Sequence, residues 1–147
     1  MKRKTYVILF LILSLFSVRA LAENKLSIPV LEIGAGKEAS VPIYLSNDSQ
    51  VVAIQFRLHL PKGFTMSDTS SLTVSDRKTN HTVSIKKMAS QEYLVVLFSI
   101  TNTALRGNSG LLFRLPVLVP DTCVTGHRFS FRFSEVILSA RNGANLE

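Results

Sequence analysis

The chain has 147 residues, 46% of them hydrophobic and 18% charged, with 17 lysines and arginines against 10 acids. This length supports one domain with a core of its own. The single cysteine, Cys123, excludes an intramolecular disulfide. The basic residues are scattered and form no dense stripe, which argues against a nucleic-acid partner.

The first 22 residues have the pattern of a secretory signal peptide. Basic residues at 2–4 precede an apolar run over 6–18, and the small residues Ala20 and Ala22 follow. The run is too short to cross a hydrocarbon core of about 30 Å, so we expect no stable membrane span. We expect cleavage after Ala22, a mature domain over 23–147, and an extracellular, cell-surface or periplasmic location. Four basic residues and no acid leave with the peptide, so 13 basic and 10 acidic residues remain, a net charge of +3.

The mature chain reads as short apolar runs separated by turn residues, and no helical pattern is obvious. We predict eight strands, over 26–33, 39–45, 51–60, 70–74, 82–88, 93–100, 110–119 and 127–138. Strands of this length and spacing are typical of an all-β sandwich or barrel.

The predicted strand over 51–60 has the clearest faces. Apolar and more polar positions alternate with a period of two, which directs one set inward and the other outward. The inward set is Ile54, Phe56, Leu58 and Leu60, and the outward set is Ala53, Gln55, Arg57 and His59.

The later strands give three further expectations. Both faces are apolar over 93–100 and over much of 110–119, which predicts central strands or a covered second face. In the last strand the inward phase of the phenylalanines slips at Ser134 and Glu135, which predicts a β-bulge. The prolines within strand predictions are expected at edges, strand ends or bulges, because they lack the backbone donor; they are Pro29, Pro42 and Pro116.

A search for catalytic chemistry is negative. His59, His81 and His127 are far apart in sequence, and none lies in a nucleophile motif or beside a second metal ligand. We therefore expect a protein that is not an enzyme and uses no cofactor or metal. His59 is either a ligand contact or a solvated strand histidine. Tryptophan is absent, so no aromatic platform for a sugar is visible.

The order of motifs over 25–147 resembles a bacterial cohesin domain. The segments that carry the resemblance are 41–43 (VPI), 60–64 (LPKGF), 95–98 (VVLF), 110–113 (GLLF), 133–136 (FSEV) and 142–145 (NGAN). The resemblance implies a nine-stranded jelly-roll sandwich without catalytic activity, structurally akin to certain carbohydrate-binding modules. It implies docking to the dockerin module of a partner protein, often in an extracellular polysaccharide-degrading assembly.

The resemblance also implies a docking face on the third strand, the fifth strand and the end of the sixth. Laid on this chain, those positions are Ala53, Gln55, Arg57, Lys86, Met88 and Ile100, beside which His59 lies on the same outward set. The family often has Asn and Asp where this chain has Ala53 and Gln55, and an aromatic and an acid where it has Met88 and Ile100.

A final strand that pairs with the first is expected in the family, but the sequence stops at Glu147, after the turn-like 142–145. An open sheet edge invites another strand. The sequence is then a fragment, or 25–33 is partly disordered, or a partner supplies the strand.

A dockerin-binding module is the leading hypothesis. The alternatives are a carbohydrate-binding module and a structural or assembly subunit completed by a donated strand.

Overall fold

The computed structural model describes residues 23–68, 72–124 and 126–146, and within them the fold is all-β. The signal-peptide prediction falls on residues 1–22 and lies outside the described residues. Eleven strands are present in the described ranges: β1 (Lys25–Ser27), β2 (Leu31–Glu32), β3 (Glu38–Ser46), β4 (Ala53–His59), β5 (Thr65–Met66), β6 (Thr73–Val74), β7 (His81–Ala89), β8 (Glu92–Ser99), β9 (Ser109–Leu118), β10 (Arg128–Phe129) and β11 (Arg132–Ser139). None of the described residues forms a helix of the length and apolar character that a bilayer crossing needs.

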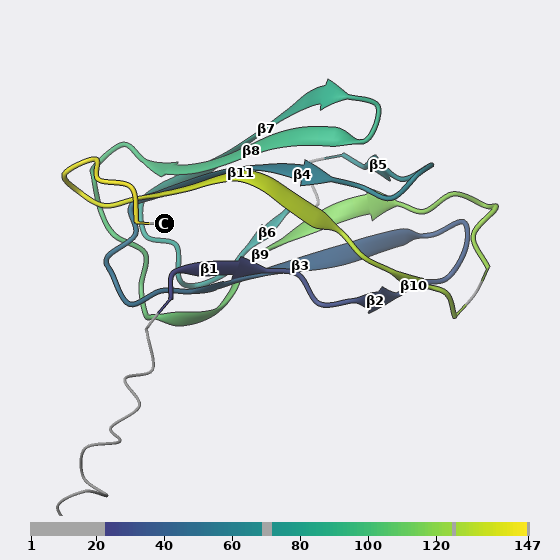
Figure 1. The fold of residues 1–147 in the computed structure, drawn as a ribbon, viewed down its shortest axis with the longest axis horizontal. Coiled ribbons are helices and arrows are strands. Elements are labelled where there is room, and N and C mark those ends of the chain that lie inside the picture. Colours follow the sequence, from purple (N-terminus) through teal and green to yellow (C-terminus); the bar gives the residue numbers. More distant parts are fainter. Residues whose placement is uncertain (1–22, 69–71, 125, 147) are drawn as a thin grey trace, which may run out of the picture.

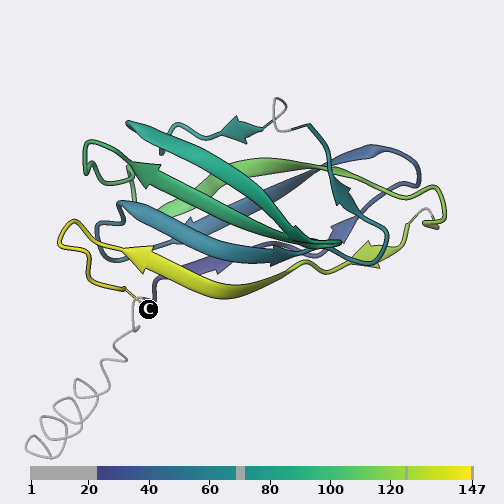
Figure 2. The ribbon, with the colours of Figure 1, turned by 90° about the horizontal axis from the view of Figure 1, so that it is seen from above.

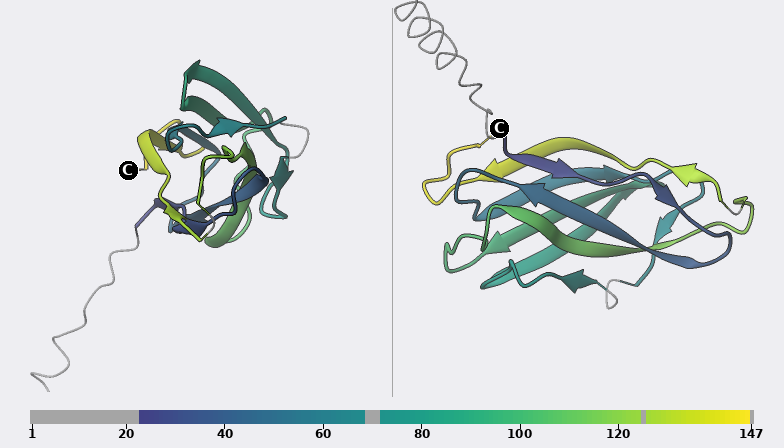
Figure 3. Two further views of the ribbon diagram at one scale, coloured as in Figure 1. Left: turned by 90° about the vertical axis from the view of Figure 1, so that its right-hand side faces the viewer. Right: turned by 90° about the horizontal axis from the view of Figure 1, so that it is seen from below.

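Two sheets face each other as the layers of a sandwich (Figures 1 and 3). One has the order β11-β4-β8-β7, and the other has the order β1-β3-β9-β5 with β6 also paired to β9. The short pair β10-β2 lies beside them. All these pairings are antiparallel. The predicted two-sheet sandwich is therefore confirmed.

The core lies between the layers, where the inward side chains of both sheets meet. The predicted inward set of β4 is buried, with Phe56 and Leu58 fully excluded from solvent. Phe56 stacks on Phe113 of β9 across the sandwich, with ring centroids 6.2 Å apart. Phe133 of β11 meets Phe56 edge-on at 4.9 Å. Period-two alternation thus places one aromatic contact between the two sheets, Phe56 with Phe113, and one within the four-stranded sheet, Phe56 with Phe133.

Three of the eight strand predictions need correction. The run 26–33 is two strands, because Pro29 interrupts it and β2 leaves β1 to pair with β10. The run 127–138 is likewise divided into β10 and β11. In the run 70–74 the structure has only Thr73–Val74 as β6, residues 70 and 71 lying outside the described residues. The short β5 was not predicted.

The bulge prediction is confirmed. The register between β11 and β4 shifts between Ser134 and Ile137. After the shift Leu138 is fully buried and Ile137 is exposed. Two residues of β11 therefore lie opposite one residue of β4, which restores the inward phase of the strand.

Of the three prolines, Pro29 lies at a break between strands, whereas Pro42 and Pro116 lie within the ladder of β3 and β9, close to irregular positions. Pro29 falls between β1 and β2, and Pro42 is one residue from a register shift in β3. Pro116 lies inside β9, opposite the gap between its pairings with β5 and β6. A missing backbone donor is tolerated at such places.

After β11 the chain turns back toward β1 (Figure 1). Asn145 bridges Ser139, and the side chain of Asn24 donates a 2.8 Å hydrogen bond to the carbonyl of Leu146. In the described part of the chain no strand pairs with the side of β1 that faces away from β3. The predicted open edge is thus present within those residues.

Arg77 is buried with no carboxylate beside it, being 9% exposed. Its guanidinium joins the turn after β6, the end of β3 and the loop before β9. Burial lowers its pKa from the usual value. Its five acceptors, at 2.6 to 3.5 Å, are the backbone carbonyls of Leu45, Arg106, Gly107 and Gly110 and the side-chain oxygen of Asn47.

Phe131 and Arg132 test the assignment of inside and outside. Phe131 is 8% exposed and meets Phe64 edge-on, whereas Arg132 is exposed. We expect Phe131→Asp to unfold the domain, because it removes about 3 kcal/mol or more of packing and places a carboxylate in the core. We expect Arg132→Asp to remain folded. Melts followed by circular dichroism with the opposite order would mean that the two faces are exchanged.

His81 is a buried histidine whose surroundings predict a pH-dependent stability. Its Nδ1 accepts the backbone N–H of Thr79 at 3.2 Å, and its Nε2 donates to the carbonyl of Val52 at 3.1 Å. Burial is the main cause that lowers its pKa below 6.5; the hydrogen bond to Val52 opposes this and the charge of Lys78 adds to it.

A histidine whose pKa is lower in the folded state than in the unfolded state stabilises the protein at pH values above its pKa in the unfolded state, near 6.5. This stability is lost as the pH falls toward and through its pKa in the folded state. We expect urea unfolding to show lower stability at pH 5.0 than at pH 7.5, and His81→Gln to reduce this difference. An unchanged difference would show that His81 is not its source.

Candidate binding face

The outward side of the four-stranded sheet is the candidate site, called here the outer face (Figure 2). Its rows follow from the register, because residues directly opposite one another in antiparallel strands share a face. Read from β11 across β4 and β8 to β7, one row is Ile137, Gln55, Val96 and Ser84. The next row is Ser134, Arg57, Leu94 and Lys86. The last row, at the end near the β7–β8 turn, is Arg132, His59 and Glu92.

An apolar stripe runs along the middle of the outer face. Leu94, Val96 and Phe98 project outward from β8 and are half-buried, while the alternate residues of β8 are buried in the core. Both faces of β8 are therefore apolar although one faces solvent, in a strand flanked by β4 and β7. Partly exposed apolar side chains that lie together and are edged by polar groups mark interaction surfaces.

Arg57 joins three strands of this face. It contacts the carboxylate of Glu92 on β8, and its Nε donates to Glu135 of β11 at 2.6 Å. The hydrogen bond with Glu92, followed by that with Glu135, raises the pKa of Arg57 above its usual value. The side chain of Arg57 is 31% exposed, so the cluster can touch a partner. With one arginine and two glutamates, the cluster has a net charge of −1.

The bulge of β11 places Glu135 in this cluster. Glu135 has a φ of 49°, in the left-handed region that a side chain other than glycine rarely adopts. Such strain persists where the surrounding structure holds it, and it is often found at functional sites. The bulge therefore directs the carboxylate of Glu135 toward Arg57 instead of along the regular ladder.

At the β7–β8 end of the outer face, His59 lies beside two open hollows. One is about 350 Å³ and includes Ser134, whose Oγ lies 2.6 Å from His59 Nε2. The other is about 330 Å³ and reaches the turn at Ser90. Both are lined by His59 and Arg132. His59 is thus half-buried and bonded to a neighbouring strand, so it differs from a freely solvated histidine.

The structure places four of the candidate residues in the paired rows of the outer face, whereas Met88 and Ile100 pair with no described residue in those rows. Gln55, Arg57 and His59 lie on one face of β4, and Lys86 lies two strands away in the row of Arg57. Met88, 43% exposed, is at the register shift that ends β7, and Ile100, 83% exposed, follows the opposite end of β8. Their role in binding stays a prediction.

Several residues of this face were missed by the sequence reasoning. They are Leu94, Val96, Phe98, Arg132 and Glu135. The apolar character of 93–100 on both faces is the sequence signal for the stripe. By itself it predicts only a central strand or a covered second face, and it does not indicate a binding surface. Arg132 and Glu135 could be placed only once the register of β11 was known.

Metal-ligating side chains do not cluster in the described residues. Within 23–68, 72–124 and 126–146, no group of three or more histidines, cysteines and acids is placed to hold a metal ion. Cys123 is a half-buried free thiol packed against the core.

Comparison with solved structures identifies the fold. One similar structure is the sixth cohesin of scaffoldin B from Acetivibrio cellulolyticus, solved with a dockerin. The alignment covers 84% of this chain and 91% of that cohesin chain, with a TM-score of 0.71 and 17% sequence identity. A type I cohesin–dockerin complex from Clostridium thermocellum matches 84% and 92%, with a TM-score of 0.67 and 18% identity. A cohesin module of a Clostridium perfringens family 33 glycoside hydrolase matches 86% and 90%, with a TM-score of 0.65 and 11% identity.

This chain therefore has the cohesin fold, and the resemblance in its sequence is confirmed at the level of fold. No family model matches the sequence. No curated protein matches it either.

Proposed function

We propose that this chain is a secreted cohesin-like module that binds a dockerin-type module of another protein through the outer face. It is a binding module and catalyses no reaction. The setting that fits is an extracellular assembly, of the kind that degrades polysaccharides. The observation that carries the proposal is the apolar stripe of Leu94, Val96 and Phe98 on an exposed sheet face edged by polar side chains.

The arrangement of the outer face suits protein docking. Stable interfaces bury about 800 Å² on each partner, and a few central side chains supply most of the binding energy. The stripe supplies apolar side chains at the centre, and Lys86, Gln55 and the Arg57 cluster supply a polar surround. Two of the solved cohesins that share this fold were crystallised with dockerins.

Export is part of the proposal and has its own test. The basic residues at 2–4, the apolar run at 6–18 and the small residues Ala20 and Ala22 support cleavage after Ala22. Mass spectrometry of the protein recovered from outside the cytoplasm is expected to give a chain that begins at Glu23. A recovered chain that still begins at Met1 would contradict the export mechanism and leave the binding proposal standing.

Isothermal titration of the mature chain with the dockerin modules encoded in the same genome tests the binding proposal. At least one is expected to bind with one-to-one stoichiometry and a negative change in heat capacity, because apolar surface is buried. Absence of binding across the whole set would refute dockerin recognition. The fold would be unaffected by that result.

A further inference from the structure

The end of the outer face near the β7–β8 turn carries a cation without a partner. Arg132 is exposed, and no hydrogen bond or ion pair joins its guanidinium to another of the described residues. It lies opposite His59 in the register of β11 and β4, and both line the two open hollows. Both hollows include this pair in their lining, so a partner group that enters either one comes near Arg132.

No other group at this end of the described chain pairs directly with Arg132. Glu92, which lines one hollow, is engaged by Arg57, and Glu135 is engaged by the same arginine. His59 Nε2 is held by Ser134, and its Nδ1 has no hydrogen-bond partner among the described residues. A carboxylate that entered either hollow would therefore find a free guanidinium and, in the tautomer in which the Ser134 hydroxyl donates to His59 Nε2, a free Nδ1–H donor.

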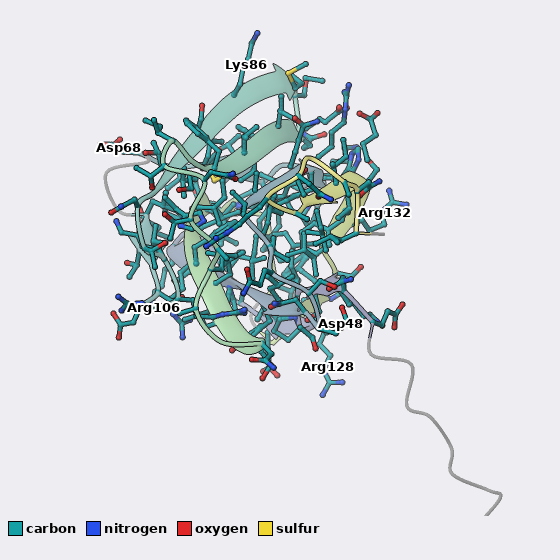
Figure 4. All side chains as sticks on the ribbon, turned by 90° about the vertical axis from the view of Figure 1, so that its left-hand side faces the viewer. Asp48, Asp68, Lys86, Arg106, Arg128 and Arg132 are labelled. Carbon is teal, nitrogen blue, oxygen red and sulfur yellow. The ribbon has the colours of Figure 1, made fainter. Side chains whose placement is uncertain are left out.

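A second cation without an ionic partner in the described ranges lies on the opposite edge of the outer face. Lys86, on the opposite edge strand β7, has no ionic partner in the described part of the chain, while both carboxylates of the face are bound to Arg57. Figure 4 shows Lys86 and Arg132 pointing outward from different edges of this sheet, away from Arg106 and Arg128. The three cations Arg57, Arg132 and Lys86 and the two carboxylates give the face a net charge of +1, and its two edge cations have no ionic partner among the described residues.

From this arrangement we propose that an aspartate or glutamate side chain of the protein partner binds beside His59, where the two hollows share their lining. Arg132 is the residue that recognises this carboxylate. The partner's contact surface is then acidic where it meets Arg132 and Lys86, and apolar where it meets the stripe. The inference rests on the proposed function and deepens it, because it assigns the chemistry of the docking partner. Charge-assisted hydrogen bonds between guanidinium and carboxylate are stronger and more directional than neutral ones.

The test uses the mature chain labelled with ¹⁵N and a hexaglutamate peptide with blocked ends, at low ionic strength so that screening is weak. Saturable shifts are expected at the amides of His59, Ser90, Gln91 and Ser134. Arg132→Gln is expected to weaken the apparent affinity about fivefold, while Arg128→Gln, the same change at an exposed arginine of β10, leaves it unchanged. Thermal melts of both variants check that the fold is intact.

The proposal is overturned if hexaglutamate shifts no amide at this end, if hexalysine shifts the same amides, or if Arg128→Gln weakens binding as much as Arg132→Gln. A second arm uses a dockerin that binds. Unchanged affinity with Arg132→Gln overturns the carboxylate site while the proposed function stands. Specific hexaglutamate binding without any dockerin binding supports the anion site and refutes the dockerin proposal alone.

Discussion

Replacing Arg77 with methionine is expected to lower the free energy of unfolding by about 3 kcal/mol or more, which corresponds to a fall in Tm of about 10 °C for a domain of this size. Methionine fills similar space but donates nothing. The carbonyls at the end of β3 and in the loop before β9 then lose their buried donor together. Each buried polar atom left without a partner costs about 1–3 kcal/mol, although water that enters the site offsets part of this cost.

Arg106→Met is the matched control for this change. Arg106 is exposed, and it meets Arg77 only through its backbone, accepting a hydrogen bond at its carbonyl and donating one from its N–H. The same substitution there removes an arginine side chain and no buried hydrogen bond, so we expect stability to change by less than about 0.5 kcal/mol. Urea unfolding of both variants makes the comparison. Equal effects would show that the buried guanidinium does not hold the loops together.

The largest effect on binding is expected from Leu94→Ala. Leu94 lies on the outer face between Arg57 and Lys86, in the middle of the sheet. Truncating a central apolar side chain of an interface typically costs about 2 kcal/mol, and therefore the affinity for a dockerin partner should fall about 30-fold. Isothermal titration measures the loss, and the melting temperature of the variant checks that the domain is folded.

Leu118→Ala provides the matched control on the other sheet. Leu118 is 47% exposed at the end of β9, where it pairs with Glu38 and Thr65. We expect this variant to bind the dockerin with unchanged affinity. Loss of affinity with Leu118→Ala and none with Leu94→Ala would place the interface on the opposite sheet.

The parts of the fold that sequence patterns predicted are those set by local alternation. Ile54 to Leu60 alternate with a period of two, so the buried face of β4 follows directly from the sequence. The slip of phase at Ser134 and Glu135 predicted the bulge for the same reason. These features need no knowledge of which strands are neighbours.

Features that depend on neighbours could not be predicted in this way. The break at Pro29 was missed because the separation of β1 from β2 is decided by the pairing of β2 with β10, about 100 residues later. Arg77 was missed because its acceptors are mostly backbone carbonyls, which any residue type supplies. Glu92 and Glu135 reach Arg57 only because three strands lie side by side.

In the proposed function the outer face, and not the opposite sheet, contacts a protein partner. Methyl NMR spectra of the mature chain, recorded with and without a bound dockerin, test it directly, because leucine and valine methyl groups report both sheets. The account predicts that the methyl signals of Leu94 and Val96 move while those of Leu111 and Leu118 on β9 stay in place. Movement of the β9 signals alone would contradict it.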